Sequence, residues 1–394
     1  MLSRRECFDY ILKQLPMLGM DAECKKVAEE LGNSRRPLII FGAGVRNCVK
    51  QAREMVARLN VPVIVTWGAR DLFPDAETFG THGNRAGNFA VQSADYILAV
   101  CTRLDTKATG SPASSFAPLA KLVMVDVDHN EIAKMEKIGR PLYKAFNVDA
   151  LDFICAMNLH SEQCEPKGDW AAKIEDWKAR FPVETKGRLN PYAVVKELSD
   201  LMSADDVLVS DTGCSVAWLM QAFEFKGQQF VHAFNNTPMG YGLPAAVGAA
   251  FATGRRVVLV TGDGGLGVNI TELATIARHN LNIKIVLLNN EGHQMCRQTQ
   301  RQWLGGVYPA TSHEGGLATP DFSEIAIAYG IEARSISCDS QAFLKWLLKA
   351  DGPGFLELRI PKDADVAPMV KFGRSIEHGD PEIEDVAGIL SEAL

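Results

Sequence analysis

Long apolar runs and an excess of positive charge are both missing from this sequence of 394 residues. No apolar stretch reaches the roughly 18 residues of a membrane-spanning helix, so a membrane protein is not expected. Lysine and arginine number 41 against 48 acids, a net charge of −7, which leaves no basic footprint for nucleic acid. Acids, Lys13 and Gln14 interrupt the apolar residues of the N-terminus, which therefore does not fit a signal peptide.

Closely spaced cysteine pairs are missing as well. The nine cysteines are scattered, and no two form a C-x-x-C pair, which argues against zinc sites and against a disulfide framework. We therefore expect reduced thiols in a cytoplasmic protein. With 47% hydrophobic and 23% charged residues the composition is that of an ordinary globular protein. The length allows two or three domains.

Strand and helix patterns alternate in two long segments, which predicts an α/β fold with two doubly wound parallel-sheet domains. The predicted divisions are a helical lead-in at 1–34, a middle α/β domain at 35–160, a linker at 161–187, a second α/β domain at 188–372 and a tail at 373–394. Strands are expected in the middle domain at 37–41, 62–66, 96–101 and 121–126, and residues 145–149 lead into its last helix, at 150–159. In the second domain they are expected at 207–210, 230–233, 257–261, 283–288, 333–337 and 355–360.

The segments outside the two domains have weaker patterns. Residues 21–31 are amphipathic and are expected to be helical. The linker carries a predicted helix across the domain boundary, and the helical spacing of Trp170 and Trp177 favours packing over a ligand site. Residues 362–394 have no strand pattern and end in an amphipathic segment at 382–394.

The stretch 257–294 carries the chemistry around which the chain is organised. A buried strand is followed by a predicted glycine-rich turn, a helix and a second buried strand, and Gly262, Gly264 and Gly267 satisfy G-x-G-x-x-G. A dinucleotide site would place an acid near the end of the second strand. Here that strand ends in Asn289 and Asn290, and a carboxylate, Asp263, lies inside the turn instead.

A carboxylate beside a pyrophosphate requires a cation between them. Asp263 and the amide oxygen of Asn290 are hard oxygen ligands at neighbouring strand ends, and Mg²⁺ prefers such ligands together with phosphate and water. We therefore favour a metal–diphosphate site, with a plain turn capped by asparagine as the alternative. The pattern Gly42-Ala43-Gly44 after the first strand is a weaker dinucleotide signal, because Asn47 stands where a third glycine is expected, and a structural turn is the alternative there.

At these residues the sequence resembles thiamine diphosphate-dependent enzymes. Gly262-Asp263-Gly264 is followed by 24 residues, Gly265 to Leu288, and then by Asn289-Asn290, which matches their GDG–NN signature. The wider similarity, over nearly all of the chain after residue 35, is to the acetolactate synthase-like group. The resemblance implies thiamine diphosphate and Mg²⁺ as cofactors, with the metal held by Asp263, Asn290 and the main-chain carbonyl of Gly292.

The same resemblance implies a cofactor-binding set at four strand ends. By this resemblance, Gly213, Cys214 and Ser215 form a diphosphate loop at a helix start, Thr237 binds the aminopyrimidine through its carbonyl, and Met239 holds the cofactor bent. Asp263, Gly264 and Gly265 follow the third strand, and Asn290, Gly292, His293, Gln294 and Met295 follow the fourth. Main-chain atoms near His293 and Gln294 contact the diphosphate, and Met295 lies near the reacting carbon. Two alternatives stand beside it. Cys214 is a possible nucleophile, although no histidine lies beside it in sequence, and Met239 is a possible core residue.

Substrate-facing and middle-domain features follow from the resemblance too. Residues 297–300 and 302–306 look like a lid over the substrate, and the bulky aromatic that many acetolactate synthases have near Thr299 is missing, which counts against acetolactate synthesis itself. In the middle domain, which binds FAD or an ADP group in some members, FAD is a possible further cofactor. His82 and Arg85 either line a cleft or hold a loop.

Family members also need a pyrimidine-binding domain, whose glutamate activates the cofactor. The residues before Arg36 do not contain one, so we expect this glutamate from a separate subunit or from a longer N-terminus, and we expect an oligomer. No catalytic acid is assigned. The expected activity is decarboxylation of a 2-oxo acid or transfer of the resulting acyl carbanion. The alternatives are a catalytically silent cofactor-binding or regulatory fragment, and a nicotinamide dehydrogenase, which rests on the glycine pattern alone.

Overall fold

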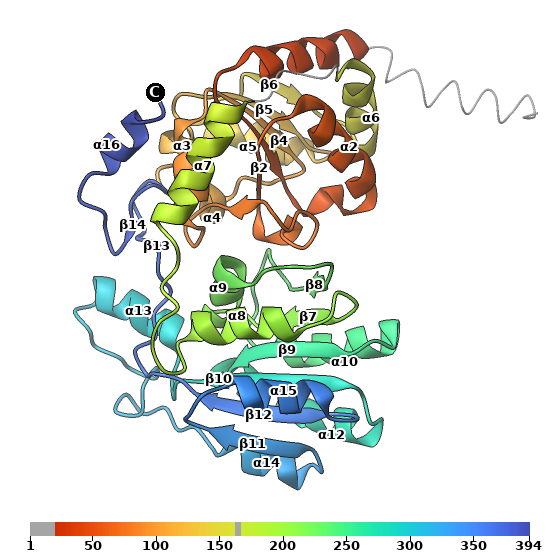
Figure 1. Ribbon diagram of the computed structural model, residues 1–394. Helices are drawn as coiled ribbons and strands as arrows, with labels where there is room; N and C mark the ends of the chain where they lie inside the picture. Colours follow the sequence, from red (N-terminus) through yellow and green to blue (C-terminus); the bar gives the residue numbers. More distant parts are fainter. Residues whose placement is uncertain (1–19, 162–166) are drawn as a thin grey trace, which may run out of the picture. The chain divides into compact units, whose positions relative to one another are not determined.

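A computed structural model describes residues 20–161 and 167–394 of the chain. The chain divides into two compact units (Figure 1), unit 1 from Met1–Pro182 with Pro368–Leu394, and unit 2 from Val183–Ala367. Residues 1–19 of the expected lead-in and 162–166 of the expected linker lie outside the described residues. Among the residues that are described, no helix combines the length and the apolar character needed to cross a bilayer.

Unit 1 is built on a six-stranded, all-parallel sheet with the strand order β3-β2-β1-β4-β5-β6. Its strands are β1 (Pro37–Phe41), β2 (Val63–Val65), β3 (Glu77–Thr78), β4 (Tyr96–Val100), β5 (Lys121–Val125) and β6 (Lys144–Phe146). Its helices are 20–33, α2 (Val49–Leu59), α3 (Arg85–Ser93), α4 (Thr106–Thr109), α5 (His129–Lys137), α6 (Ala150–His160), α7 (Gly168–Arg180) and α16 (Val386–Ser391), with 3-10 helices η1 (Ala43–Cys48), η2 (Trp67–Ala69) and η3 (Ala113–Ser115).

Both faces of this sheet are buried, which explains why its strands read as continuous apolar runs. Ile39 and Phe41 of β1 pack into one core with the helix at 20–33, α2 and α6. Leu38 and Ile40 of the same strand pack into the opposite core with α3 and α7. The predicted helix at 21–31 is confirmed within 20–33, whose buried residues recur at helical spacing: Met20, Cys24, Val27, Ala28 and Leu31.

The expected linker helix and the C-terminal segment both pack on unit 1. Trp170 and Trp177 of α7 are buried in its core, and Trp170 Nε1 donates a hydrogen bond to the carbonyl of Pro37, so the two tryptophans serve packing as predicted. Two short strands, β13 (Met369–Val370) and β14 (Gly379–Asp380), pair antiparallel where no strand was expected. With two residues each they are too short to produce a pattern.

Unit 2 has a second six-stranded, all-parallel sheet with the order β11-β12-β10-β9-β7-β8. All six predicted strands are present: β7 (Val207–Ser210), β8 (Gln229–Val231), β9 (Val257–Gly262), β10 (Ile283–Asn289), β11 (Glu332–Ile336) and β12 (Gly354–Arg359). The helices are α8 (Pro191–Leu201), α9 (Cys214–Ala222), α10 (Gly242–Thr253), α11 (Asp263–Val268), α12 (Leu273–Arg278), α13 (Gln294–Trp303), α14 (Phe322–Ala328) and α15 (Gln341–Lys349), with η4 (Ile270–Glu272). The prediction of two doubly wound α/β domains is therefore confirmed.

One local prediction is wrong. The glycine-rich stretch after β9 is not a turn but the short helix α11, which begins at Asp263. Glycine is a poor helix former, so the sequence pattern favoured a turn. Packing of this stretch against neighbouring strand ends outweighs that preference, as the contacts below show.

Candidate functional site

The predicted site residues of unit 2 follow four strands that are neighbours in the sheet, in the order β10-β9-β7-β8 (Figure 1). Because these strands are parallel, the segments that follow them emerge at one edge of the sheet. The four segments are 211–215 after β7, 232–241 after β8, 263–265 after β9 and 290–295 after β10.

Asp263 occupies the first position of α11 and is only 3% exposed. Its Oδ1 accepts a hydrogen bond from Gly264 N and its Oδ2 accepts one from Gly292 N, each at 2.8 Å. Burial raises the pKa of this carboxyl in spite of these two bonds. No lysine or arginine of the described residues forms an ion pair with it. A buried carboxylate without an ion pair fits a bound cation, and Asp263 has the chemistry that a Mg²⁺ ion requires.

The turn after β10, which contains the other two expected metal ligands, contacts Asp263. Gly292 contacts Asp263 through its N–H, and Asn290, which is buried, lies two residues before it. Glu291 between them has a φ of +53°, a left-handed conformation that is uncommon for a residue with a side chain. A Cβ at Gly292 would lie 2.7 Å from the carbonyl oxygen of Thr311, so only glycine fits there.

Two of the three glycines after Asp263 are required by neighbours from other strand ends. A Cβ at Gly264 would overlap the His293 ring, and one at Gly265 would lie 2.7 Å from Asp211 Oδ1. A Cβ at Gly267 would meet nothing within 4 Å. In a dinucleotide fingerprint the third glycine is needed for close helix–strand packing. The free space at Gly267 therefore argues against the dinucleotide interpretation of this motif.

Asp211 organises the site and was not singled out from the sequence. Its carboxylate is 1% exposed and accepts hydrogen bonds from Thr212 N at 2.8 Å, Gly240 N at 3.1 Å and Gly242 N at 2.7 Å. Burial raises the pKa of Asp211 despite these bonds. This one side chain ties the end of β7 to the loop after β8. Its only sequence signal was its place directly after a buried strand.

The start of α9 follows Asp211. Gly213 has a φ of +88° and precedes Cys214, the first residue of the helix. Burial raises the pKa of the Cys214 thiol far above neutral pH, which argues against a nucleophile. The Ser215 hydroxyl donates to the carbonyls of Asp211 and Thr212, each at 3.2 Å. The main-chain N–H groups at the start of α9 are thus the groups of this loop that suit an anion.

The loop after β8 presents Met239 to solvent. Thr237 has a φ of +43° and Gly240 a φ of +89°, and Asn269 Nδ2 donates to the Gly240 carbonyl at 2.7 Å. Met239 between them is 48% exposed. An exposed methionine on a loop fixed at Gly240 is not a core residue, so the packing alternative is wrong.

Helix α13 contains His293 as its N-cap, followed by Gln294 and Met295, and the expected substrate lid at 297–300. It is held by the segment 361–367. Gln294 Nε2 donates to Asp365 Oδ1 at 2.6 Å, and the Gln298 side chain bonds both the carbonyl and the N–H of Val366. The buried Gln294 Oε1 has no hydrogen-bond partner in the described chain. Gln294 and Gln298 thus attach this helix to the segment 361–367.

The glycine motif of unit 1 also has a packing explanation. A Cβ at Gly42 would overlap the carbonyl of Cys101, and one at Gly44 would lie 2.6 Å from Cys101 Cβ. The absence of a side chain at both glycines therefore leaves room for the segment that follows β4. Arg85 donates to the carbonyls of Gly379 and Pro381 and thereby holds the C-terminal segment on unit 1. His82 Nδ1 lies 3.0 Å from the Thr81 hydroxyl.

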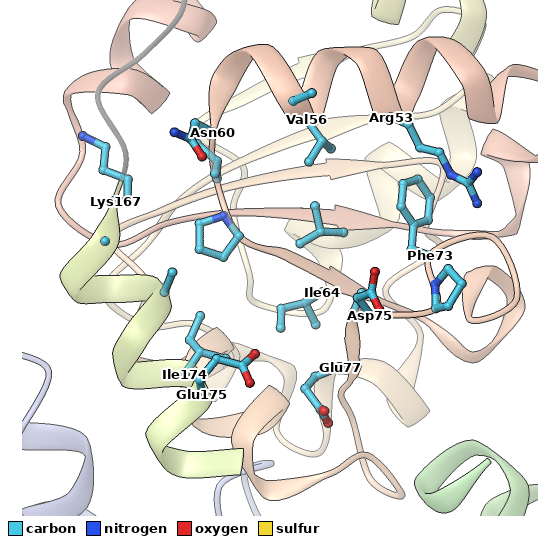
Figure 2. Close-up of a pocket in the computed structure, with 18 residues that line it drawn as sticks. Arg53, Val56, Asn60, Ile64, Phe73, Asp75, Glu77, Lys167, Ile174 and Glu175 are labelled. Carbon is cyan, nitrogen blue, oxygen red and sulfur yellow. The ribbon is translucent and has the colours of Figure 1, made fainter. Parts of the chain in front are cut away.

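A cavity of about 830 Å³ lies elsewhere in unit 1 (Figure 2), between α2, β2, the segment before β3 and α7. Ile64 and Ile174 form part of an apolar floor. Two cations at its rim already have partners, since Arg53 donates to the carbonyl of Leu72 and Lys167 to that of Gly32. In the described chain no three or more His, Cys, Asp or Glu side chains are grouped to hold a metal.

Two family models match the two units. Residues 24–151 match the central domain of thiamine pyrophosphate enzymes, and residues 211–358 match their C-terminal TPP binding domain. Among curated proteins, the chain is 30% identical over 362 residues to the acetolactate synthase isozyme 1 large subunit of Escherichia coli K12 (89% of this chain, 63% of the relative). It is 32% identical over 371 residues to the isozyme 2 large subunit of the same organism (90% and 65%). It is 30% identical over 387 residues to the chloroplastic acetolactate synthase 2 of Zea mays (92% and 59%). The chain thus spans 59–65% of the length of these relatives.

Proposed function

We propose that this chain, which belongs to the thiamine pyrophosphate enzyme family, is a Mg²⁺- and thiamine diphosphate-dependent enzyme component that acts on a 2-oxo acid. The family membership rests on the two matching domain models and on the similarity to acetolactate synthase large subunits. The reaction we propose is decarboxylation of the 2-oxo acid, transfer of the acyl carbanion to an acceptor, or both. When bound, thiamine diphosphate supplies the nucleophilic carbon and the electron sink that such reactions need.

The observation that carries this proposal is the buried, ion-pair-free carboxylate of Asp263 at the start of a helix, in contact with Gly292. Burying a carboxylate is costly unless it is paired or coordinates a metal. We propose that Asp263, the Asn290 side chain and the Gly292 carbonyl hold Mg²⁺. The metal would screen the Asp263 carboxylate from the diphosphate, so that two negatively charged groups could lie close together at this edge of the sheet.

The remaining predicted residues have roles that agree with their positions. We propose that main-chain N–H groups of Gly213, Cys214 and Ser215 bind phosphate oxygens. The exposed Met239 would contact the middle of the cofactor, and the Thr237 carbonyl would accept a hydrogen bond from its amino group. A second group of main-chain atoms, at Gly264, Gly265, His293 and Gln294, would contact the diphosphate, and Met295 would lie towards the reacting carbon.

Activation of the cofactor requires a pyrimidine-binding domain with its glutamate. We propose that another chain or preceding sequence supplies it, so that the active site forms only in an assembly. The name large subunit carried by the bacterial relatives supports assembly into an oligomer. A cytoplasmic location is supported by the cysteines of the described chain, which form no disulfide. FAD in unit 1 is a separate proposal, tested by flavin titration of the purified protein.

Calorimetry of thiamine diphosphate binding tests the proposal. The protein is titrated with and without Mg²⁺, alone and with a pyrimidine-binding-domain protein encoded near it. Mg²⁺-dependent binding is expected in both cases, and tighter binding with the partner. Absence of Mg²⁺-dependent binding in both settings refutes the proposal.

An activity assay separates the enzyme from a silent module. Pyruvate and larger 2-oxo acids are offered to the assembled complex, and release of CO₂ is measured along with the organic product. An aldehyde product indicates a decarboxylase and a 2-hydroxy ketone or acetohydroxy acid indicates carbon–carbon bond formation. Binding without turnover, with every partner tested, favours a catalytically silent cofactor-binding fragment.

A further inference from the structure

Glu357 is a fully buried carboxyl residue on an interior strand of the unit 2 sheet. It lies on β12, is 0% exposed, and is flanked by the buried apolar residues Leu356 and Leu358. Charged side chains are seldom fully buried unless they have a defined partner. An apolar side chain would suit this layer, so the carboxylate requires a specific explanation.

One residue supplies the polar contact. Asn289 Nδ2 donates to Glu357 Oε1 at 2.5 Å, while Glu357 Oε2 is buried without a hydrogen-bond partner in the described chain. No lysine or arginine of the described residues forms an ion pair with Glu357. The contact joins Asn289, the last residue of β10, to the neighbouring strand β12. In the register of these two strands, Glu357 is paired with Leu287, two residues before Asn289.

The other end of Asn289 reaches the turn that follows β10. Its Oδ1 accepts a hydrogen bond from Glu291 N at 2.9 Å. Glu291 is the residue with a φ of +53°, and such a conformation persists only where its surroundings hold it. The next residue, Gly292, donates its N–H to Asp263. A continuous chain of contacts therefore runs from Glu357 through Asn289 and the turn to Asp263.

A carboxylate at position 357 sets the direction of this chain. Glu357 Oε1 accepts the hydrogen bond from Asn289 Nδ2, so the NH₂ group of Asn289 faces Glu357. Its carbonyl oxygen then faces Glu291, where an acceptor is needed. A glutamine at 357 presents both a donor and an acceptor and removes this requirement. A leucine removes the polar contact altogether.

We propose that Glu357 is a positioning residue for the divalent cation site. Through Asn289 it fixes the turn that places the Asn290 side chain and the Gly292 carbonyl beside Asp263. This inference rests on the proposed function, because it assigns the turn to a metal. It also gives the first asparagine of the Asn289-Asn290 pair a role separate from that of the second.

The test compares E357Q and E357L with L287V in the full-length protein. L287V alters the same buried layer at the register partner of Glu357 but leaves the polar contacts in place. Hydrogen exchange of the segment 289–294 is followed by mass spectrometry. Mn²⁺ affinity in the presence of thiamine diphosphate is followed by electron paramagnetic resonance. Unfolding midpoints show how far each variant loses general stability.

In E357Q we expect exchange at Glu291 and Gly292 to rise about tenfold and Mn²⁺ to bind about 10–100-fold more weakly, as is usual when a residue that orients a metal ligand is lost. E357L should change both in the same direction. L287V should change neither the hydrogen exchange of the turn nor the Mn²⁺ affinity, even if its unfolding midpoint falls as far as that of E357Q. Wild-type exchange in E357Q, or raised exchange with unchanged Mn²⁺ affinity, overturns the assignment. If the wild-type protein itself binds no Mn²⁺, the proposed function fails, and raised exchange in E357Q with unchanged exchange in L287V still supports the positioning of the turn.

Discussion

Two alanine substitutions within one short helix test the packing around Asp263. Gly265 and Gly267 both belong to α11, but a Cβ at Gly265 would lie 2.7 Å from Asp211 Oδ1, whereas a Cβ at Gly267 meets nothing within 4 Å. Asp211 has no room to give way, because three main-chain N–H groups hold its carboxylate. A Cβ at Gly265 would also lie 3.2 Å from Thr261 Oγ1, so the two variants differ in contacts with Asp211 and Thr261 and share the same change in backbone freedom.

The magnitudes follow from these surroundings. Gly267→Ala should be neutral or stabilise the protein by about 0.5–1 kcal/mol, the usual gain from replacing glycine within a helix. Gly265→Ala gains the same amount but overpacks a fixed neighbour, which costs about 1–3 kcal/mol or more. The expected difference in free energy of unfolding between the two variants is thus on the order of 1–3 kcal/mol.

Urea denaturation of the two variants without metal or cofactor measures this difference. Unit 1 is identical in both, so any difference in their unfolding belongs to unit 2. Gly265→Ala should also weaken binding of thiamine diphosphate, because a displaced Asp211 releases the loop that carries Met239. Equal stability of the two variants would refute the reasoning, and a larger loss in Gly267→Ala would restore the dinucleotide interpretation of the motif.

Three further predictions concern buried charged groups. Asp211→Asn places an amide donor against the N–H group of either Gly240 or Gly242, which bind different carboxylate oxygens. We expect a loss of about 1–3 kcal/mol in a urea titration and faster hydrogen exchange of residues 237–242, and unchanged exchange there contradicts the role of Asp211. Asp263→Asn should leave the fold intact and remove the Mg²⁺ dependence of thiamine diphosphate binding in calorimetry, whereas retained dependence would place the metal elsewhere. Burial lowers the pKa of Lys284 to about 8, below the roughly 10.4 of an exposed lysine. Between these two pKa values the unfolded state binds more protons than the folded state, so the free energy of unfolding should rise with pH, by on the order of 2 kcal/mol. If Lys284→Met shows the same dependence of stability on pH as the wild type, Lys284 is not its source.

Much of the fold follows from local pattern. The strands of unit 2 were predictable from their own residues and from the polar turns that follow them. β9 and β10, for example, are buried on both faces and therefore read as nearly uninterrupted apolar runs. The contact of Asp263 with the turn after β10, through Gly292 N, was predictable as well, because parallel strands deliver their ends to one edge. Both predictions use information within a few residues of each strand.

What the sequence did not reveal depends on contacts between distant residues. Helix α11 was not predicted because its glycines disfavour a helix locally. The side chains for which these glycines leave room, Asp211 and His293, are remote in sequence. The role of Asp211 depends on Gly240 and Gly242, which lie 29 and 31 residues away. Packing of the C-terminal segment on unit 1 involves a bond from Asn88 to the carbonyl of Ile376, across 288 residues. No local pattern carries such information.

The glycine motif after β9 shows how one spacing serves two opposite electrostatic arrangements. In a dinucleotide site the start of the helix faces a pyrophosphate directly, and its N–H groups and dipole attract the anion. At the start of α11 the N–H of Gly264 is instead bonded to the Asp263 carboxylate, which brings a negative charge to the same position. Because this charge repels an anion, we propose a cation between Asp263 and the diphosphate. Gly264 and Gly265 leave room for His293 and Asp211, and the acidic group at the first residue of α11 distinguishes this motif from a dinucleotide site.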